Sequence, residues 1–470
     1  MFPNSLRSFK LPQATGSDRS ASGVFWRLCS GLAVLAIGTF IACAVWKVSP
    51  SANIAVDWGT TYQTIDGFGA SSAGDVDTLS PGLMDIFYAT SNSDLGLDFI
   101  RLKIYPNLTD CEGDEGAGNC AKVAAGPTLS TPDLANAQAA IARGARVVAG
   151  EWSPPGPMKT SGGYQGGGAF KGDSSNYSDL ASLQAAFVDE MAKTYHIPIY
   201  ALSPQNEPDV IEPYPTCSWT AQQYHDYVPY LAAALAKTGH SDVKILIAEK
   251  STWATTYDTV AMNDPAVAAD IAILAEHAYG SSASRLTWNN FTHQHIWQTE
   301  VSDFGPHDDS IKNALIYAKQ IHDWLTVADV NAWFWWALKD DQGETHNCCL
   351  ADLNGTIAKR AYAIGNWSRF VRPGWQRIGV TNSGPLLITA FKGPKQQFAV
   401  VVVNNRRWPV WRQTFTLSGV TARRAPITPW LTSAKASLTP QPAVSLNAAG
   451  TAFTYSLPAR SIVTFQGQGD

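Results

Sequence analysis

The chain has few charged residues and no excess of basic ones. Charged residues make up 16% of the 470 positions, with 34 Lys and Arg against 39 Asp and Glu, and the formal net charge is −5. A protein that binds nucleic acid needs a surplus of Lys and Arg to neutralise phosphates. The composition therefore argues against a nucleic-acid partner, and 45% hydrophobic residues indicate a folded globular protein.

The spacings by which proteins commonly bind zinc are also missing. The chain has seven cysteines and nine histidines, but no Cys-x-x-Cys and no two histidines four residues apart. We therefore expect no metal. Cys111 and Cys120 bracket a Gly-rich acidic loop and can form a disulfide, which export would permit. Cys217, Cys348 and Cys349 are three candidates for one further bridge, so one thiol should remain free.

One uncharged run, residues 28–46, is long enough to cross the hydrocarbon core of a membrane. Positive charges precede it, at Arg7, Lys10, Arg19 and Arg27. This pattern predicts that residues 1–49 form a cytoplasmic leader and a membrane anchor or signal segment, with the rest of the chain exported. The length favours an uncleaved anchor, while residues 42–44, Ala-Cys-Ala, leave a cleaved signal and a secreted protein open. We expect contact with a membrane only through this segment.

Residues 199–209 place one carboxylate at the end of a buried strand. The run begins with the apolar residues 199–203, and Pro204 and Pro208 prevent a helix or a central strand from continuing through the polar residues that follow. Glu207 is therefore displayed at the carboxyl end of the strand. A single glutamate at a strand end is ordinarily just a surface residue.

Residues 295–303 repeat this arrangement and deliver Glu300, with a break near Gly305 and Pro306. Two such glutamates are what cleavage of a glycosidic bond with retained configuration requires. One carboxyl protonates the leaving oxygen while the other attacks the anomeric carbon, with the two groups about 5–5.5 Å apart. We predict that Glu207 is the acid/base and Glu300 the nucleophile, a reaction that needs no cofactor.

Eight apolar, strand-like runs alternate with segments of helical periodicity, such as residues 182–195 and 311–324. This alternation predicts an α/β fold, a (β/α)8 barrel over residues 64–370, with chemistry at the carboxyl ends of its strands. By this count Glu207 follows the fourth strand and Glu300 the seventh. The expected strands are residues 65–70, 97–104, 146–152, 199–203, 244–249, 271–277, 295–299 and 331–337.

Beyond the barrel, short alternating strands separated by Gly, Pro and Asn replace the helical pattern. We expect residues 50–63 and 371–468 to form a flanking β-sandwich. A structural role for it is favoured, although Trp408, Trp411 or Trp430 could bind polysaccharide.

Three motifs resemble glycoside hydrolase family 30, which includes bacterial glucuronoxylan xylanases, glucosylceramidases and β-1,6-glucanases. They are residues 65–69 (Ile-Asp-Gly-Phe-Gly), 203–209 (Ser-Pro-Gln-Asn-Glu-Pro-Asp) and 297–300 (Trp-Gln-Thr-Glu). The resemblance implies a retaining β-glycosidase that acts on a polysaccharide or glycoside, most simply as an endo-β-1,4-xylanase, and we expect a monomer. Glucosylceramidase-like or β-1,6-glucanase activity remains an alternative, as does a non-catalytic glycan-binding protein.

The same resemblance assigns roles to six further residues. It implies that Arg101 braces Glu300, that Asn206 bonds the 2-hydroxyl of the sugar, and that Tyr279 bonds the nucleophile or the sugar. His277, from the same His-x-Tyr motif, is as readily explained as a core residue. Trp152 and Trp336 occupy positions where sugars stack on aromatic rings, although packing inside the barrel would explain them equally.

One loop departs from the pattern of the glucuronoxylan xylanases. In that subfamily, a pair of arginines after the eighth strand binds the carboxylate of a glucuronic acid branch. Here the matching region has Lys339 followed by Asp340 and Asp341, whose charges would repel such a branch. A neutral xylan or another β-linked glycan is therefore the expected substrate.

Overall fold

The computed structural model describes residues 53–73, 76–123, 126–340, 343, 345–381, 383–422 and 426–469. The apolar run 28–46 lies outside these residues, so the expectation of an anchor or signal is not addressed. Within the part of the chain that is described, no helix has the length and hydrophobicity to cross a membrane.

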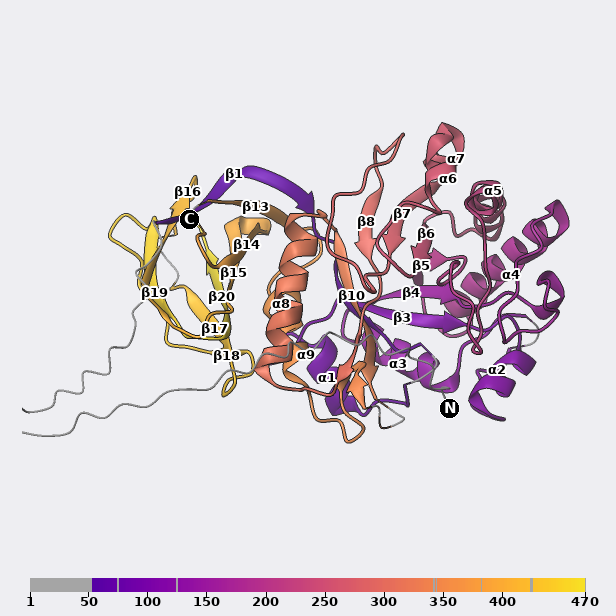
Figure 1. The fold of residues 1–470 in the computed structure, drawn as a ribbon, viewed down its shortest axis with the longest axis horizontal. Helices are drawn as coiled ribbons and strands as arrows, with labels where there is room; N and C mark the ends of the chain where they lie inside the picture. The colour runs from indigo at the N-terminus through magenta and orange to yellow at the C-terminus, as the bar shows by residue number, and fades with distance from the viewer. Residues whose placement is uncertain are drawn as a thin grey trace, which may run out of the picture. The chain divides into compact units, whose positions relative to one another are not determined.

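Eight parallel strands form a closed barrel, which confirms the predicted fold class (Figure 1). The ring closes because β10 pairs with both β8 and β2. In chain order the strands are β2 (Gly67–Ser71), β3 (Phe99–Ile104), β4 (Arg146–Glu151), β5 (Ile199–Ser203), β6 (Lys244–Lys250), β7 (Ile271–Glu276), β8 (His295–Gln298) and β10 (Ala332–Lys339). Their residues are almost all buried, because helices cover the outside of a parallel barrel.

The helices between the strands begin at strong capping residues. Ser130 accepts a hydrogen bond from the backbone of Asp133, and Thr220 forms a reciprocal capping box with Gln223. The predicted helical segments 182–195 and 311–324 belong to α4 and α8. The helices are α1 (Pro81–Tyr88), α2 (Leu108–Glu115), α3 (Thr131–Ile141), α4 (Ser174–Lys193), α5 (Ala221–Thr238), α6 (Thr259–Asn263), α7 (Pro265–Asp270), α8 (Ile311–Thr326) and α9 (Lys359–Ser368), with 3₁₀ turns at η1 (Gly156–Met158) and η2 (Pro394–Gln396).

Aromatic rings fill the barrel at the amino-terminal ends of its strands. The ring of Phe99 lies 5.0 Å from that of Trp297 and 5.3 Å from that of Phe334, measured between centroids. Gly69 is required beside them, since a Cβ there would lie 2.5 Å from the Phe334 ring. The indole of Trp297 donates to Asp66, which precedes β2. This packing closes the amino-terminal end and leaves the carboxyl ends of the strands for polar residues.

The remaining strands form a largely antiparallel sheet that belongs to the predicted β-sandwich. The amino-terminal strand β1 (Ile54–Thr64) pairs with β13 and β16, so both ends of the described chain contribute. The other members are β13 (Gln376–Thr381), β14 (Leu387–Lys392), β15 (Gln397–Asn404), β16 (Val410–Ser418), β17 (Thr428–Thr432), β18 (Thr439–Pro440), β19 (Ala452–Leu457) and β20 (Ser461–Gln468). Short strands β9 (Asp303–Pro306), β11 (His346–Asn347) and β12 (Cys349–Ala351) extend the loops after β8 and β10.

Barrel and sandwich share buried residues. Phe391, Val401 and Ile462 of the sandwich belong to the same apolar cluster as Trp367 of α9. The indole nitrogen of Trp367 also donates to the hydroxyl of Thr389 at 2.8 Å. The two layers are thus joined by a common core and not by a linker alone.

Candidate active site

The two predicted glutamates face each other at the carboxyl ends of the barrel strands. Glu207 follows β5 and Glu300 follows β8, the fourth and seventh strands of the ring. Their side chains are nearly buried, and a carboxylate oxygen of each, with a nitrogen of His277, lies in a group whose members are all within 4.8 Å of one another. This separation suits a retaining pair, because an inverting pair needs about 6.5–9.5 Å to admit a water.

The backbone around Glu207 is held in an unusual conformation. Glu207 has φ 45° and Glu249, at the end of β6, has φ 54°, a region that residues other than glycine seldom occupy. The amide of Glu207 donates to the carbonyl of Glu249 at 3.0 Å, and the amide of Asn206 donates to the carbonyl of Glu151 at 2.7 Å. These bonds tie three neighbouring strand ends together and fix the direction of the Glu207 side chain.

Arg101, fully buried on β3, lies at the centre of the site. Its Nη1 donates to Oε2 of Glu300 at 2.7 Å, and its Nε donates to Oε1 of Glu249 at 3.2 Å. Its Nη2 donates to Oδ1 of Asn206 at 2.6 Å, and the guanidinium lies 4.7 Å from the ring centroid of Trp152. One buried cation thus orients two carboxylates and an amide, as expected for a charge that must be paired.

His277 connects the three carboxylates. Its Nδ1 lies 3.0 Å from Oε1 of Glu207, while its Nε2 lies 3.8 Å from Glu300 and 3.9 Å from Glu249. Burial lowers the pKa of His277, but the charge of Glu300 and the contacts with Glu207 and Glu249 outweigh this effect and raise it to about 10. The imidazole is therefore cationic at neutral pH and is part of the site, not an inert core residue.

The pKa values of the other two acids, Glu249 and Glu300, are shifted in opposite directions. For Glu249, burial raises the pKa, yet the charge of Arg101 and the contact with His277 bring it down to about 2. Burial keeps the pKa of Glu300 above that of an ordinary glutamate, although His277, Arg101 and a hydrogen bond from Tyr279 oppose it. The hydroxyl of Tyr279 donates to Oε1 of Glu300 at 2.9 Å. Both oxygens of Glu300 are thus held by donors that favour the ionised form.

Aromatic side chains surround the pair. Trp152 and the half-buried Trp336 lie with ring centroids 6.2 Å apart, so both reach the same side of the site. Phe304 of β9 is 73% exposed and its ring lies 5.7 Å from that of Tyr279. Such an exposed ring beside the nucleophile offers an apolar face for a sugar.

The structure brings together all eight residues singled out from the sequence, and adds three that sequence reasoning missed. Glu249 ends a barrel strand, and that position alone could have identified it. Tyr214 lies in the loop after β5 and is 37% exposed. Burial, the charges of Glu207 and Glu300 and a hydrogen bond with Glu207 raise its pKa well above the usual value. No local pattern in the sequence marks Tyr214 or Phe304.

The chemistry of the donor atoms does not favour a metal at this cluster. Glu207, His277 and Glu300 could together offer three ligand atoms. However, a metal-binding histidine must be neutral, whereas His277 has a pKa of about 10, and Arg101 and Tyr279 already occupy the oxygens of Glu300. The cluster is better suited to moving protons.

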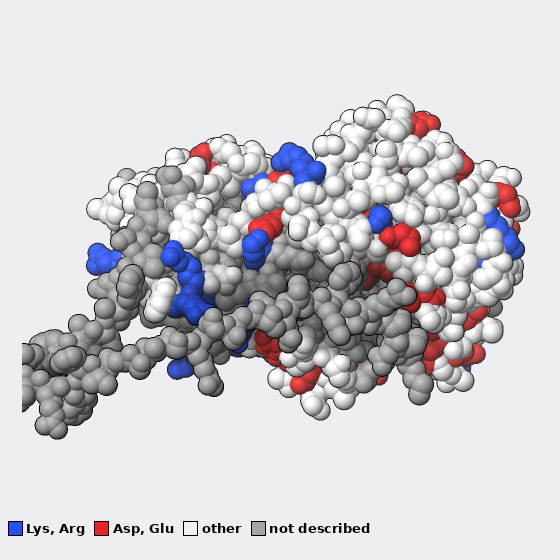
Figure 2. Space-filling model, viewed as in Figure 1, with Lys and Arg blue, Asp and Glu red and all other residues white. Residues whose placement is uncertain are grey.

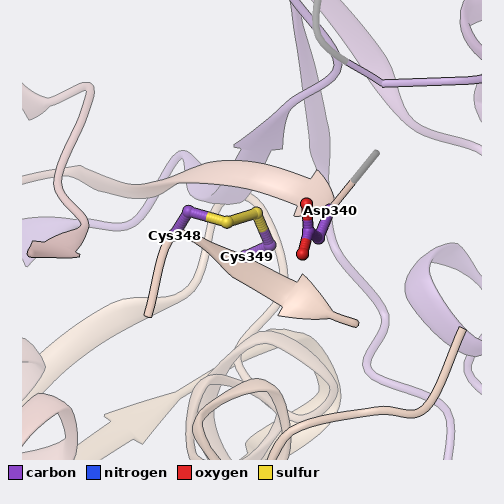
Figure 3. A group of neighbouring side chains, drawn as sticks. All are labelled: Asp340, Cys348 and Cys349. Carbon is purple, nitrogen blue, oxygen red and sulfur yellow. A yellow bond between two sulfur atoms is a disulfide. The ribbon is translucent and has the colours of Figure 1, made fainter. Parts of the chain in front are cut away.

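A second group, Asp340, Cys348 and Cys349, lies after β10 (Figure 3). The two sulfurs are joined in a disulfide between adjacent residues, so neither is a thiolate that could bind a metal. Cys111 and Cys120 form the other disulfide, and Cys217 is the free cysteine among the described residues. Burial raises the pKa of the Cys217 thiol to about 12, which leaves it protonated and unreactive. The sequence left these pairings open.

A closed parallel barrel with two glutamates across its mouth, backed by a β-sandwich, defines the class of barrel glycoside hydrolases. Comparisons with known proteins identify the family. Residues 65–313 match the glycosyl hydrolase family 30 TIM-barrel domain, and residues 374–465 match the family 30 beta sandwich domain. The chain belongs to glycoside hydrolase family 30, as its motifs predicted, and is a glycoside hydrolase.

Named relatives come from several parts of the family. Glucuronoxylanase XynC of Bacillus subtilis is 27% identical over 435 residues, covering 89% of this chain and 92% of the relative. The structure of Xyn30A, a family 30 subfamily 8 xylanase from Clostridium acetobutylicum, matches with a TM-score of 0.75 and 30% identity, covering 88% of this chain and 99% of that chain. Putative glucosylceramidase 3 of Caenorhabditis elegans is 24% identical, covering 73% of each chain.

Proposed function

We propose that this protein is a retaining endo-β-1,4-xylanase that acts outside the cytoplasm. The observation that carries the proposal is the pair Glu207 and Glu300, with carboxylate oxygens within 4.8 Å of each other at the mouth of the barrel. The likeness to glucuronoxylanase XynC and to Xyn30A supports xylan as the substrate.

In the first step, an ionised Glu300 attacks the anomeric carbon of the sugar and the glycosidic bond breaks. Glu207 gives its proton to the departing oxygen, so the shortened glycan leaves as an alcohol while the remaining sugar is bound to Glu300 as an ester. Tyr279 and Arg101 hold the two oxygens of Glu300 ready for this attack.

In the second step, Glu207 removes a proton from a water that attacks the same carbon from the opposite side. The ester breaks, Glu300 is released as a carboxylate, and two inversions restore the original configuration. The charge of Glu300 is absent while the ester exists. This removes a negative neighbour of Glu207 while Glu207 acts as a base.

The buried positive charges of the site match two of its carboxylates. Arg101 and the imidazolium of His277 supply two positive charges, which balance the carboxylates of Glu249 and Glu300. A third negative charge would be uncompensated in a nearly dry site.

Asn206 is placed to bind the sugar. Its oxygen accepts from Arg101, and among the described residues no acceptor faces its side-chain nitrogen. That nitrogen can donate to the 2-hydroxyl of the bound sugar, a contact that strengthens in the transition state. Trp152 and Trp336 would supply the apolar surface on which the ring rests.

The surroundings of the site favour a neutral chain. Asp340 follows β10 directly, in the region where the resemblance to the glucuronoxylan xylanases would require arginines, and Asp341 lies outside the described residues. The amine of Lys339 is turned towards the backbone and donates to the carbonyl of Asp340 at 2.8 Å. We infer that unsubstituted stretches of xylan are preferred.

A second candidate is cleavage of a glucosyl lipid. The exposed side chains of Phe304 and Ile211, in the loops that follow β8 and β5, would suit an apolar aglycone. The similarity to the putative glucosylceramidases of Caenorhabditis elegans is compatible with it. The lower coverage of those relatives makes xylan the better supported choice.

Digestion of four substrates side by side tests the proposal. Xylan should be cut into short oligosaccharides, faster than glucuronoxylan with its branches intact. Linear β-1,6-glucan and a glucosyl lipid should be unchanged. A Glu300→Gln variant should lose all turnover while it keeps the melting temperature of the native protein. Hydrolysis of the glucosyl lipid or of β-1,6-glucan in place of xylan would overturn the assignment of substrate.

A further inference from the structure

The charges of the chain are divided between barrel and sandwich. The protein as a whole is acidic, yet between positions 353 and 469 the sequence has no Asp or Glu and fourteen Lys and Arg. Strands β13 to β20 all lie in this segment. On the face drawn in Figure 2, Lys and Arg side chains gather mainly on the left, where Figure 1 draws the sandwich strands, and Asp and Glu mainly on the right.

Three arginines of this segment form ion pairs with aspartates of the barrel. Arg360 pairs with Asp309, Arg372 with Asp98 and Arg377 with Asp329, all at 2.6–2.7 Å. Arg372 and Arg377 thereby join the sandwich segment to the barrel, while Arg360 of α9 pairs within the barrel. They account for the basic residues along that boundary.

Another group of cations has no such explanation. We call the side chains of Arg406, Arg407, Trp408, Trp411 and Arg412 the Arg/Trp edge. In the ranges that the structure describes, no carboxylate lies within 4.0 Å of these three arginines. Three arginines without a carboxylate partner, on one loop and the strand that follows it, form a local excess of positive charge, which favours an anionic ligand.

The loop that carries three of these residues is held in a fixed shape. The buried side chain of Asn404 donates to the carbonyls of Trp408 at 3.1 Å and Pro458 at 2.7 Å. The amide of Arg460 donates to the carbonyl of Arg406 at 3.0 Å. The loop between β15 and β16 is therefore anchored to the β19–β20 turn before any ligand binds, which lowers the entropic cost of binding.

A β-bulge displays the other two residues. Val410 pairs with Leu457 and Gln413 with Tyr455, so β16 has one residue more than β19 over this stretch. Arg412, with φ 49°, donates its amide to the hydroxyl of Ser456 at 3.1 Å. As a result Trp411 and Arg412 are both exposed, although neighbours on a regular strand point to opposite faces.

The tryptophans of the sandwich differ in their surroundings. Trp408 is 49% exposed and Trp411 is 38% exposed, which is unusual for so large an apolar group. Trp430, in contrast, is covered by the guanidinium of Arg369 at 4.4 Å and packs against Phe370. Of the three tryptophans considered from the sequence, Trp408 and Trp411 are the two that are exposed.

We propose that the Arg/Trp edge binds an acidic polysaccharide whose sugars carry carboxylates. A guanidinium forms paired hydrogen bonds with a carboxylate, and an indole face stacks on a pyranose ring, so a surface that carries both residue types suits a chain of uronic acid residues. The edge would hold charged regions of a cell-wall glycan while the cleft, with Asp340 at its border, takes neutral ones. This function is independent of the hydrolysis proposed above.

The test is the binding of the full chain to polygalacturonate, with the carboxyl-reduced form of that polymer as the neutral comparison. Affinity electrophoresis should show strong retardation by polygalacturonate, weakened by salt, and little by the reduced polymer. A triple variant, Arg406→Gln, Arg407→Gln and Arg412→Gln, should bind polygalacturonate at least about tenfold more weakly. Trp408→Ala with Trp411→Ala should weaken binding without any change in charge.

The matched control is a triple variant with the same loss of charge on the barrel, Lys122→Gln, Lys237→Gln and Lys312→Gln, three exposed residues. It should bind as the native protein does. All variants should keep the native melting temperature and rate of xylan hydrolysis. Equal binding by the arginine variant and the native protein, or by the reduced and acidic polymers, would overturn the proposal. Tighter Arg-dependent binding to phosphatidylglycerol vesicles than to polygalacturonate would assign the edge to lipid instead.

Discussion

At the scale of single residues, the site is a compact balance of buried charges. Arg101 and His277 face Glu207, Glu249 and Glu300 inside a nearly closed space, and these contacts help to set the pKa values of His277, Glu249 and Glu300. In such a site the loss of one hydrogen bond alters reactivity far more than it would on the surface. The effects of individual substitutions can therefore be predicted from the contacts.

Tyr279→Phe removes the hydrogen bond to Oε1 of Glu300 and leaves the ring in place. A bond to a charged group contributes about 1.5–3 kcal/mol, so we expect kcat to fall by roughly 10- to 150-fold with little change in KM. Steady-state kinetics on xylan measures this. Tyr195→Phe is the control, because the hydroxyl of Tyr195 bonds to the backbone carbonyl of Lys122. A change in KM alone would show that Tyr279 only binds the sugar.

The raised pKa of His277 makes stability depend on pH. Because the folded value of about 10 exceeds the unfolded value near 6.5, His277 stabilises the fold fully below pH 6.5, and this contribution disappears as the pH rises towards 10. Urea unfolding of the native protein and of His277→Gln should differ most near pH 6 and least near pH 10. A difference that is constant over this range would contradict a buried imidazolium.

At the scale of elements, the loops after β4 and β5 support each other beside the acid. Gly167, with φ +76°, passes so close to the loop that carries Tyr214 that a Cβ there would lie 2.4 Å from Ile211. The amide of Gly166 also donates to the carbonyl of Pro213 at 3.2 Å. Gly166 and Gly167 thus form a close packing contact between the two loops.

Gly167→Ala should therefore displace the loop of Tyr214. We expect a loss of about 1–2 kcal/mol in the free energy of unfolding, from the positive φ and the clash, together with a several-fold lower kcat/KM. Gly163→Ala in the same loop is the matched control, since its Cβ would meet nothing closer than 3.7 Å. Thermal unfolding and kinetics of both variants test this, and identical behaviour of the two would argue against a packing role.

The strands and their ends could be predicted from the sequence, whereas the loops could not. Buried parallel strands are continuous apolar runs, so the residue that follows each run, such as Glu207 or Glu300, lies in the site by geometry. Tyr214 and Phe304 lie near the site because of the way the loop after β5 and the short strand β9 fold. Hydrophobic periodicity in the sequence does not predict such a fold. The disulfide of Cys348 and Cys349 was one of three possible pairings, since sequence alone does not fix connectivity.

At the scale of the whole molecule, barrel and sandwich depend on each other. Phe391, Val401 and Ile462 share a core with Trp367, and β1 reaches the sandwich from the other end of the chain. A fragment limited to residues 64–370 would expose this core. We expect it to aggregate and to show no cooperative thermal transition, unlike a fragment of residues 50–470. A soluble, cooperatively melting barrel would contradict a shared core.

The configuration of the first product tests the central claim most directly. Proton NMR during the first minutes of hydrolysis, before the free sugar equilibrates, distinguishes the two anomers at the new reducing end. Two displacements by Glu300 and then water predict that the β-anomer appears first and the α-anomer only later, by mutarotation. Initial release of the α-anomer would show a single displacement and would contradict the roles proposed for Glu207 and Glu300.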